Sequence, residues 1–507
     1  MKSRLTALCK QLLVFISENL MLVGILVCVT LSILSRAYFD LSYISPDSAH
    51  YLRAAREILR GNGFYVYPEW FGIWPLGYPF LIAVTAFVTR AEVYLASKIL
   101  SIIIVWIIGI MLYKRFNRIA WAYAFVMFNV GFRYIFFYTW SETAFILGMF
   151  LLAFVTVDII CDETVKASHY IRLTFASLLM FLSRYIGAFA LIVIGVLWLT
   201  FLFRRIKLKD KLSGKRVLYL TAAGAVTGIF IISYLLLNQR MTGYMTGTPR
   251  VPAGHLRDTL LELYRAMMIE MDYVFDTFIA IGPLRAALLL WVFFIGFLFY
   301  SFARHKEGLA QNDRAVITPL VFILIGVVYW LAIVAMRLSA HFDDFDFRLL
   351  FPSSAMLFIG FVGLLTLNDR IKQFFKLYSA KIIPVLCLCG FIMMMLVITP
   401  RLSGTSGYRQ TRDHVLSVYA GIPDGAVVLW GDTLHLMFLR DNVDSVHVDL
   451  SSDDIAGFWE TLKDYDEIYI NIPAMKKHLD EYDGFAGELY GYFYHYRESG
   501  EMLEKLR

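Results

Sequence analysis

The chain has few of the residues that build metal centres and disulfide frameworks. Only five of its 507 residues are cysteines, and they show neither metal-ligand spacing nor an even disulfide framework. They lie in or beside apolar stretches, as Cys9, Cys28, Cys161, Cys387 and Cys389. This pattern excludes a disulfide-stapled secreted domain and a structural zinc module. We therefore expect the cysteines to be packing residues.

The chain is also poor in charge. Charged residues make up 17% of it against 59% hydrophobic residues, and the mean hydropathy is +0.63. The basic residues are scattered through short loops and do not form a basic and aromatic stretch, so we expect no nucleic-acid partner. Several uninterrupted apolar runs of about eighteen or more residues predict instead a polytopic, mainly α-helical membrane protein.

The charges are divided unevenly along the chain. From residue 400 onward there are 19 acidic and 10 basic residues, whereas the preceding part has 22 acidic and 37 basic residues. This difference predicts two domains, a transmembrane domain over 1–400 and a separate domain over 401–507.

Hydropathy predicts eleven membrane spans. They cover 11–34, 96–113, 119–138, 143–161, 170–184, 186–203, 217–237, 286–303, 315–336, 348–366 and 382–399. The stretch "LGYPFLIAVTAFVT" (76–89) has only fourteen residues and contains Pro79, so we expect it to be a juxtamembrane helix. With this count the cluster "RRIKLKDKLSGKR" (204–216), which holds seven basic residues, lies in the cytoplasm, as the positive-inside rule requires. The N-terminus is then cytoplasmic, and the domain after the last span is extracytoplasmic.

One short helix is expected in the first outer loop. In "YISPDSAHYLRAAREILRGNGF" (43–64), Ser45 suits the N-cap, Pro46 the first helical position, and Gly61 the end of the helix. Asp47 falls in the first turn, where the helix dipole favours a carboxylate. The polar side of the helix carries His50, Arg53, Glu57 and Arg60. An ordinary interfacial helix has the same features, with its acid serving the dipole and its arginines meeting lipid headgroups.

Further segments fall on the same outer face in this topology. They are "WPLGYPFLIA" (74–83), "YTWSETAFILGMFLL" (138–152), "FLSRYIGAFALIV" (181–193), "LLLNQRMTGYMTGTPR" (235–250) and "DDFDFRLLFPSSAML" (343–357). Together with "SPDSAHYLRAAREILRGNG", their order resembles the polyprenyl-phosphate-dependent membrane glycosyltransferases of the GT-C superfamily. That group includes protein O-mannosyltransferases and lipid A aminoarabinose transferases. The resemblance covers about residues 1–400.

The resemblance implies roles for particular residues. Asp47 matches the catalytic carboxylate of the first outer loop, and Glu142 matches a second acidic residue that opens a later span. Arg184 matches a basic residue that contacts the donor phosphate. The implied function is transfer of a sugar from a polyprenyl-phosphate-linked donor to an extracytoplasmic glycan, lipid or protein, without a nucleotide cofactor.

Chemistry adds further candidates to these positions. A base must take a proton from the acceptor, and cations must stabilise the departing phosphate. Asp47 can be the base, and Arg53, Arg56, Arg184 and Arg348 can offer planar guanidinium forks. Each has a structural alternative, because Glu142 can cap its span, Arg184 can snorkel from a helix end, and Arg348 can pair with Asp343 or Asp346.

Departures from the family pattern limit what carries over. Ile73-Trp74-Pro75 stands where aminoarabinose transferases have Glu-Lys-Pro, and Asp47-Ser48 stands where protein O-mannosyltransferases have Asp-Glu. Neither substrate class is therefore inherited. Some relatives bind a divalent cation, for which Glu69, Glu142, His50 and His255 are candidates, but their spacing decides nothing. Tyr51 is a further supporting candidate on the helix of Asp47.

The region 401–507 has the pattern of a small α/β domain with a parallel sheet. Buried strands are expected in "IPDGAVVLWGD" (422–432), "DSVHVDL" (444–450) and "DEIYINIP" (466–473), with helical segments between them. It has no Gly-rich phosphate loop, nucleophile elbow or zinc spacing. Asp432 and His435 follow a strand end, where capping and packing roles are the commoner ones. We expect a non-catalytic lid or acceptor-positioning module.

Two other function classes fit a chain of this composition. A transporter or lipid flippase would carry charges near the bilayer midplane and paired repeats with broken helices, whereas the charges here gather at one face. An accessory subunit of envelope glycan assembly would need no particular carboxylate at Asp47.

Overall fold

The computed structural model describes most of the chain. The described residues are 13–39, 44–66, 69–248, 251–252, 255–269, 295–296, 313–341, 345, 347–381, 384–385, 390, 408–431, 436, 439–440, 443–446, 448, 450, 454–481 and 488–506. Most of the predicted spans 286–303 and 382–399, and Asp343, Asp346, Asp432 and His435, lie outside them.

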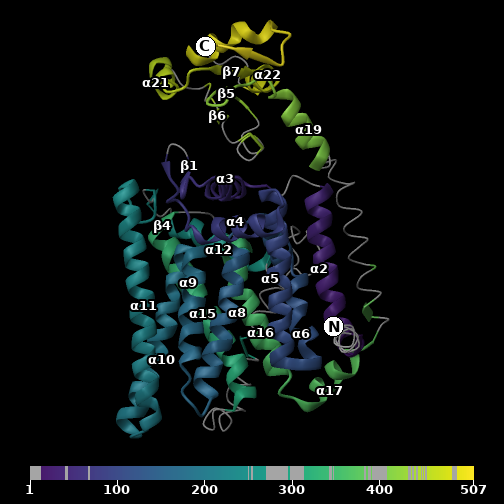
Figure 1. Ribbon diagram of the computed structural model, residues 1–507, viewed down its shortest axis with the longest axis vertical. Coiled ribbons are helices and arrows are strands. Elements are labelled where there is room, and N and C mark those ends of the chain that lie inside the picture. The colour runs from purple at the N-terminus through teal and green to yellow at the C-terminus, as the bar shows by residue number, and fades with distance from the viewer. Residues whose placement is uncertain are drawn as a thin grey trace.

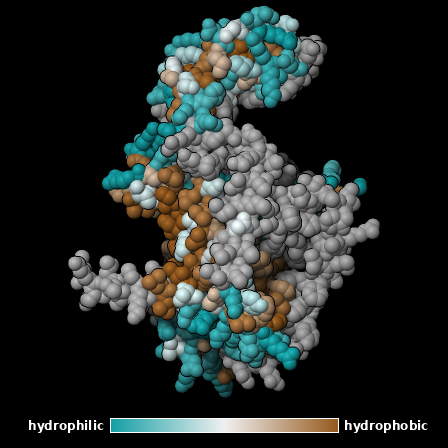
Figure 2. Space-filling model, turned by 90° about the vertical axis from the view of Figure 1, so that its right-hand side faces the viewer, coloured by the Kyte–Doolittle hydropathy of each residue, from teal (hydrophilic) through white to brown (hydrophobic). Residues whose placement is uncertain are grey.

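Long helices run side by side to form one bundle (Figure 1). Seven described segments are long and apolar enough to cross a membrane, which indicates an integral membrane protein. On the face shown in Figure 2, the coloured hydrophobic residues gather at the middle of the bundle and hydrophilic residues lie toward both ends. The helices of the bundle are α2 (Leu20–Phe39), α5 (Val93–Phe116), α8 (Glu142–Cys161), α9 (Ala167–Ser183), α10 (Ala190–Lys207), α11 (Lys211–Thr242), α15 (Arg314–Ser339) and α16 (Phe347–Leu365).

The predicted span 119–138 is not a single helix. It consists of short pieces, namely η2 (Asn117–Ile119), α6 (Ala120–Ala124), η3 (Phe125–Phe128) and α7 (Val130–Phe137). The break comes at Asn129, whose side-chain Oδ1 accepts a hydrogen bond from the Gly131 N–H at 2.8 Å and so begins α7. Irregular backbone of this kind is tolerated at membrane depth where protein surrounds it, and Asn129 is 1% exposed.

Two shorter helices lie at one end of the bundle, the upper end in Figure 1. They are α3 (Pro46–Arg60) and α4 (Gly77–Thr89), joined by the small hairpin of β1 (Tyr65–Val66) and β2 (Glu69–Trp70). The predicted caps of α3 are confirmed, because Ser45 Oγ accepts from the Ser48 N–H and Gly61 ends the helix at φ 86°. The 13 residues of α4 span about 20 Å, which is too short to cross a bilayer.

The hairpin of α15 and α16 is closely packed. A Cβ added at Gly363 would lie 2.7 Å from Pro319 Cβ, and one added at Gly360 would lie 2.8 Å from the Pro319 carbonyl oxygen. The Tyr329 hydroxyl donates to the Leu349 carbonyl oxygen at 2.7 Å near the start of α16. The glycine contacts bring the C-terminal half of α16 close to α15, and the Tyr329 hydrogen bond holds its first turn, which carries Arg348.

The remaining helices connect or flank the bundle. They are α12 (Leu256–Ile269) and α17 (Asp369–Tyr378), and η4 (Tyr185–Phe189) directly precedes α10. Two short strands, β3 (Val251–Pro252) and β4 (Ala340–His341), pair antiparallel.

The C-terminal region contains a four-stranded sheet of order β6-β5-β7-β8. The three predicted strands are present as β5 (Val427–Leu429), β6 (Asp444–Val446) and β7 (Ile468–Asn471), and they are parallel. The sequence did not indicate β8 (Leu503–Lys505), an antiparallel edge strand. The helices of this region are α19 (Tyr408–Val418), α21 (Ile455–Thr461), α22 (Ile472–Glu481), α23 (Glu488–Tyr494) and η5 (His495–Glu498).

Candidate active site

Four charged side chains meet at the α3 end of the bundle. The Arg348 guanidinium donates through Nη2 to Asp47 Oδ2 and through Nε to Glu142 Oε1. Arg184 Nη1 donates to the same Oε1 of Glu142. We call these four residues the Asp47–Glu142 cluster. It joins the first turn of α3, the starts of α8 and α16, and the end of α9.

Exposure differs within the Asp47–Glu142 cluster. The Glu142 side chain is fully buried, whereas 11% of Arg348, 15% of Arg184 and 19% of Asp47 is exposed. A fully buried carboxylate needs cationic partners, and Glu142 has two. Asp47 is the more accessible carboxylate, so it is the one that an incoming molecule can reach.

The Trp140 ring packs against the Arg348 guanidinium. The Arg348 Cζ lies 4.4 Å from the centroid of the Trp140 ring, and Tyr138 stacks on that ring at 4.2 Å between centroids. The Trp140 Nε1–H donates to Ser45 Oγ at 2.7 Å, and Ser45 is the N-cap of α3. The indole therefore links the guanidinium to the helix that carries Asp47.

Tyr51 connects α3 to Glu142. Its hydroxyl donates to Ser141 Oγ at 3.0 Å, and the Ser141 hydroxyl lies 3.4 Å from Glu142 Oε2. Complete burial, followed by the nearby charges of Asp47 and Glu142, raises the pKa of Tyr51 well above its usual value of 10. The phenol therefore stays protonated and serves as a donor.

Lys98 holds the segment that leads to Trp140. Only 1% of Lys98 is exposed, and its Nζ donates to the Phe137 carbonyl oxygen at 2.5 Å and to Thr139 Oγ1 at 3.1 Å. Ser97 Oγ also lies 2.8 Å from Thr139 Oγ1. The start of α5 thus fixes the turn before α8.

The sequence did not identify Trp140, Ser141 or Lys98 as parts of this site. The string "TWSET" offered a signal for the first two, because a polar run directly before a span places side chains at the membrane boundary. For Lys98 the signal was a lysine within an apolar run, which is costly in a membrane and calls for a partner.

The other predicted site residues of α3 lie outside the Asp47–Glu142 cluster. Arg53 Nη1 lies 3.5 Å from Asp444 Oδ1, and Arg56 Nη2 lies 3.9 Å from Glu92 Oε1. The His50 ring faces Trp74, with 5.2 Å between the ring centroids. Glu69 begins β2, and its backbone pairs with Val66. The structure therefore gives Arg53 and Arg56 carboxylate partners of their own.

The four candidates for a divalent cation, Glu69, Glu142, His50 and His255, do not gather into one group among the described residues. No three His, Cys, Asp or Glu side chains among the described residues gather in a group that could hold a metal ion. The Asp47 and Glu142 carboxylates face the same guanidinium, which already supplies the positive charge between them. His255, the remaining candidate, is exposed at the start of α12.

The fold was compared with known proteins. No family model and no curated protein sequence matches the chain. The structure of ArnT from Cupriavidus metallidurans bound to undecaprenyl phosphate matches with a TM-score of 0.54 at 10% identity, over 91% of this chain and 94% of that one. The oligosaccharyltransferase AglB from Archaeoglobus fulgidus, in complex with an inhibitory peptide and a dolichol-phosphate, matches with a TM-score of 0.47 at 11% identity, over 89% of this chain and 69% of that one.

Both of these structures hold a polyprenyl phosphate, which is undecaprenyl phosphate in ArnT and dolichol-phosphate in AglB. At such low identity the likeness concerns the fold, and the ArnT match carries it because that match spans nearly all of both chains. The membrane bundle, with its helices α3 and α4 across one end, has the fold of ArnT from Cupriavidus metallidurans.

Proposed function

We propose that the protein is a membrane glycosyltransferase that moves a sugar from a polyprenyl-phosphate-linked donor to an extracytoplasmic acceptor. The observation that carries the proposal is the Asp47–Glu142 cluster, in which an accessible carboxylate and two guanidinium groups lie together at one end of a GT-C fold. We place this end of the bundle, and the domain over 401–507, outside the cytoplasm.

Asp47 is the general base of this reaction. The acceptor hydroxyl or amine attacks the anomeric carbon of the donor sugar, and the bond from that carbon to the phosphate oxygen breaks. The proton of the acceptor passes to an Asp47 carboxylate oxygen, and the polyprenyl phosphate leaves with the bonding electron pair. Asp47 lies in the first turn of α3 with 19% of its side chain exposed, so an incoming acceptor can come within hydrogen-bond reach of its carboxylate.

Arg184 and Arg348 bind the departing phosphate. Both side chains keep an exposed fraction, 15% for Arg184 and 11% for Arg348, and a guanidinium carries five N–H donors. Guanidinium groups bind phosphate oxygens through paired hydrogen bonds, and this interaction strengthens as charge develops on the leaving group. Glu142 is then a positioning residue, since it orients both arginines without facing the donor.

The C-terminal domain restricts access to this end of the bundle. Asp444 of β6 accepts from the Arg53 guanidinium at 3.5 Å and from the Tyr465 hydroxyl at 2.8 Å, so the sheet is tied to α3. In Figure 1 the sheet lies above α3, on the side away from the bundle. This arrangement suits a lid that positions the acceptor over Asp47.

A transfer assay tests the function directly. Purified full-length protein in detergent is mixed with a panel of polyprenyl-phosphate-linked sugars and candidate acceptors, and released polyprenyl phosphate is measured. In cells, envelope glycans are compared by mass spectrometry with and without the protein. We expect one glycan to lose a sugar when the protein is absent or carries Asp47→Asn. Full restoration of that glycan by Asp47→Asn would instead favour a flippase or an accessory subunit.

A further inference from the structure

A second cluster of cations lies at the opposite end of the bundle from Asp47. The last turn of α10 and the loop to α11 carry Arg204, Arg205, Lys207, Lys209, Lys211 and Lys215, and no carboxylate of a described residue lies within ion-pair distance of any of them. All but Arg204 are exposed. The GT-C reaction proposed above makes no use of them.

Helix stabilisation explains only part of this cluster. Arg204, Arg205 and Lys207 are favourable at the C-terminal end of α10. Lys211 and Lys215 lie instead at the start of α11, where the helix dipole disfavours cations. Asp210, the carboxylate within this loop, is used as the N-cap of α11, because it accepts from the Leu212 N–H at 2.9 Å and the Ser213 hydroxyl at 2.6 Å. The loop therefore has a local excess of positive charge.

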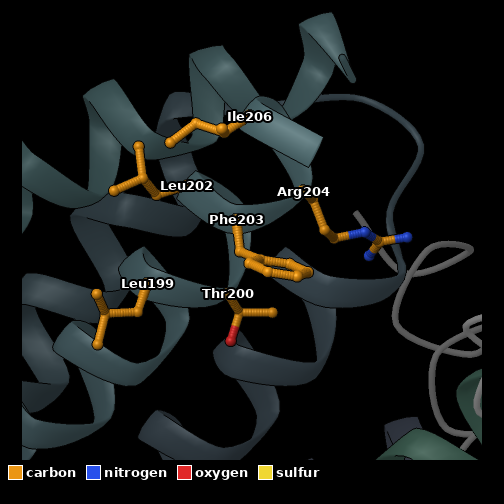
Figure 3. Close-up of a pocket in the computed structure, with 6 residues that line it drawn as sticks. All are labelled: Leu199, Thr200, Leu202, Phe203, Arg204 and Ile206. Atoms are coloured by element: carbon orange, nitrogen blue, oxygen red, sulfur yellow. The ribbon is translucent and has the colours of Figure 1, made fainter. Parts of the chain in front are cut away.

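An apolar groove adjoins these cations. It has a volume of about 560 Å³ and lies along the outer side of α10. Figure 3 shows the apolar side chains of Leu199, Leu202 and Ile206, the Phe203 ring among them, and the Arg204 guanidinium extending to one side. Lys207 Nζ lies 5.0 Å from the centroid of the Phe203 ring, so a second cation borders the groove.

We propose that this groove binds an anionic phospholipid of the surrounding leaflet. An acyl chain lies along Leu199, Leu202, Phe203 and Ile206, and the phosphate of the headgroup meets Arg204 and Lys207. Charge complementarity selects the lipid, because clustered basic residues at a membrane surface attract anionic headgroups. A basic loop that served only as a topology signal would not need an adjoining apolar groove. It would also not need the contact between Lys207 and the Phe203 ring of that groove.

Native mass spectrometry of the purified full-length protein tests this site. We compare adducts with dioleoyl phosphatidylglycerol and dioleoyl phosphatidylcholine. The variant Arg204→Gln/Lys207→Gln removes two charges at the groove, and Lys372→Gln/Lys376→Gln removes two exposed charges on α17 as a matched control. At about five-fold per basic residue, we expect the groove variant to bind phosphatidylglycerol about 25-fold more weakly and the control to be unchanged.

Two further arms separate the parts of the proposal. Thr200→Trp fills the groove and leaves the charges in place, so it should weaken both lipids; it also serves if the double variant fails to fold. Inorganic phosphate at millimolar concentration should not displace phosphatidylglycerol. Equal binding of the two lipids to the unaltered protein, an equal loss in the control, or displacement by phosphate alone would each overturn the site.

Discussion

Two clusters of carboxylates and cations lie at the two ends of α8 and differ in what surrounds them. At the start of α8, Glu142 belongs to the Asp47–Glu142 cluster. Asp158 lies sixteen residues later, about 24 Å along the helix, and belongs to a second cluster of charged side chains. Asp158 accepts from Arg115 at 2.7 Å and from Arg314 at 3.1 Å, and Arg172 lies 3.6 Å away.

The second cluster extends to the residue that follows α8. Asp162 pairs with Arg314, with Lys166 at 3.3 Å and with His169 at 3.4 Å. We call Asp158, Asp162 and these five partners the Asp158–Asp162 cluster. Several of its cations are open to solvent, with 44% of Arg314, 52% of Arg172 and 56% of Lys166 exposed.

The comparison shows that residue types alone do not identify an active site. Each cluster has two carboxylates, with two arginines in the Asp47–Glu142 cluster and five basic partners in the Asp158–Asp162 cluster. In the Asp158–Asp162 cluster many cations surround two partly exposed carboxylates. Solvent screens these ion pairs, and their role is to connect α5, α8, α9 and α15. In the Asp47–Glu142 cluster the charges balance, the side chains are largely buried, and one carboxylate remains 19% exposed. Electrostatic interactions with a reacting group are stronger there.

The largest effect is expected at Glu142. Glu142→Gln leaves two buried guanidinium groups without their shared carboxylate, so the free energy of unfolding should fall by about 3 kcal/mol or more, and transfer should be lost. Thermal unfolding in detergent measures the change. Glu92→Gln, which removes a carboxylate that is 44% exposed beside Arg56, is the matched control and should change little. A stable and active Glu142→Gln protein would show that the burial of the cluster is unimportant.

Asp47→Asn should cut turnover by about 10²-fold or more, because the variant keeps the shape of the side chain but cannot accept the proton. Binding of the lipid donor should be retained, since the two arginines still have Glu142. Transfer rate and donor affinity are measured on the same purified protein. An active Asp47→Asn enzyme would contradict the mechanism.

Arg184→Ala should act mainly on donor binding. It removes one charge-assisted contact to phosphate, so the donor affinity should fall by roughly 1.5 to 3 kcal/mol, which is a factor of about 10 to 10². Titration of the purified protein with lipid-linked sugar measures this. Arg184→Lys keeps the charge and loses the planar fork, so its donor affinity should lie between those of the unaltered protein and of Arg184→Ala. An unchanged affinity in Arg184→Ala would leave Arg348 as the phosphate ligand and Arg184 as a partner of Glu142.

Asp158→Asn tests the other side of the comparison. It weakens a partly exposed network, so it should lower the free energy of unfolding by about 1 kcal/mol and leave the transfer rate unchanged. Thermal unfolding and the transfer assay are run in parallel with Asp47→Asn. A loss of turnover as large as that of Asp47→Asn would mean that the two ends of α8 are coupled.

The smallest effect concerns pH and His50. Burial lowers the pKa of His50 below its usual 6.5, and the lesser influences of Asp47 and Arg53 oppose one another. A depressed histidine pKa means that the folded state binds its proton less readily than the unfolded state, so stability falls as the pH drops below about 6.5. His50→Gln should reduce the fall in Tm between pH 7.5 and 5.5, because glutamine takes up no proton in that range. Identical pH profiles for the two proteins would show that His50 does not contribute.

Local signals let the sequence predict several elements correctly. The bounds and caps of α3 followed from Ser45, Pro46 and Gly61, because a cap acts on its own helix end. The parallel strands β5, β6 and β7 followed from short buried runs between helical segments. The sequence did not show the break at Asn129, since an apolar stretch reads alike whether it forms one helix or several.

By itself the sequence determined that the chain is a mainly helical membrane protein, and it singled out Asp47, Glu142, Arg184 and Arg348 as candidates. Only the tertiary structure decided which of them meet. Asp47 and Arg348 are 301 residues apart, and nothing local to either indicated the other as a partner. The tertiary structure also pairs Arg53 with Asp444 and packs the Trp140 ring against the Arg348 guanidinium. Composition and periodicity report what each segment buries, whereas a charge finds its partner through the packing of helices that are distant in the sequence.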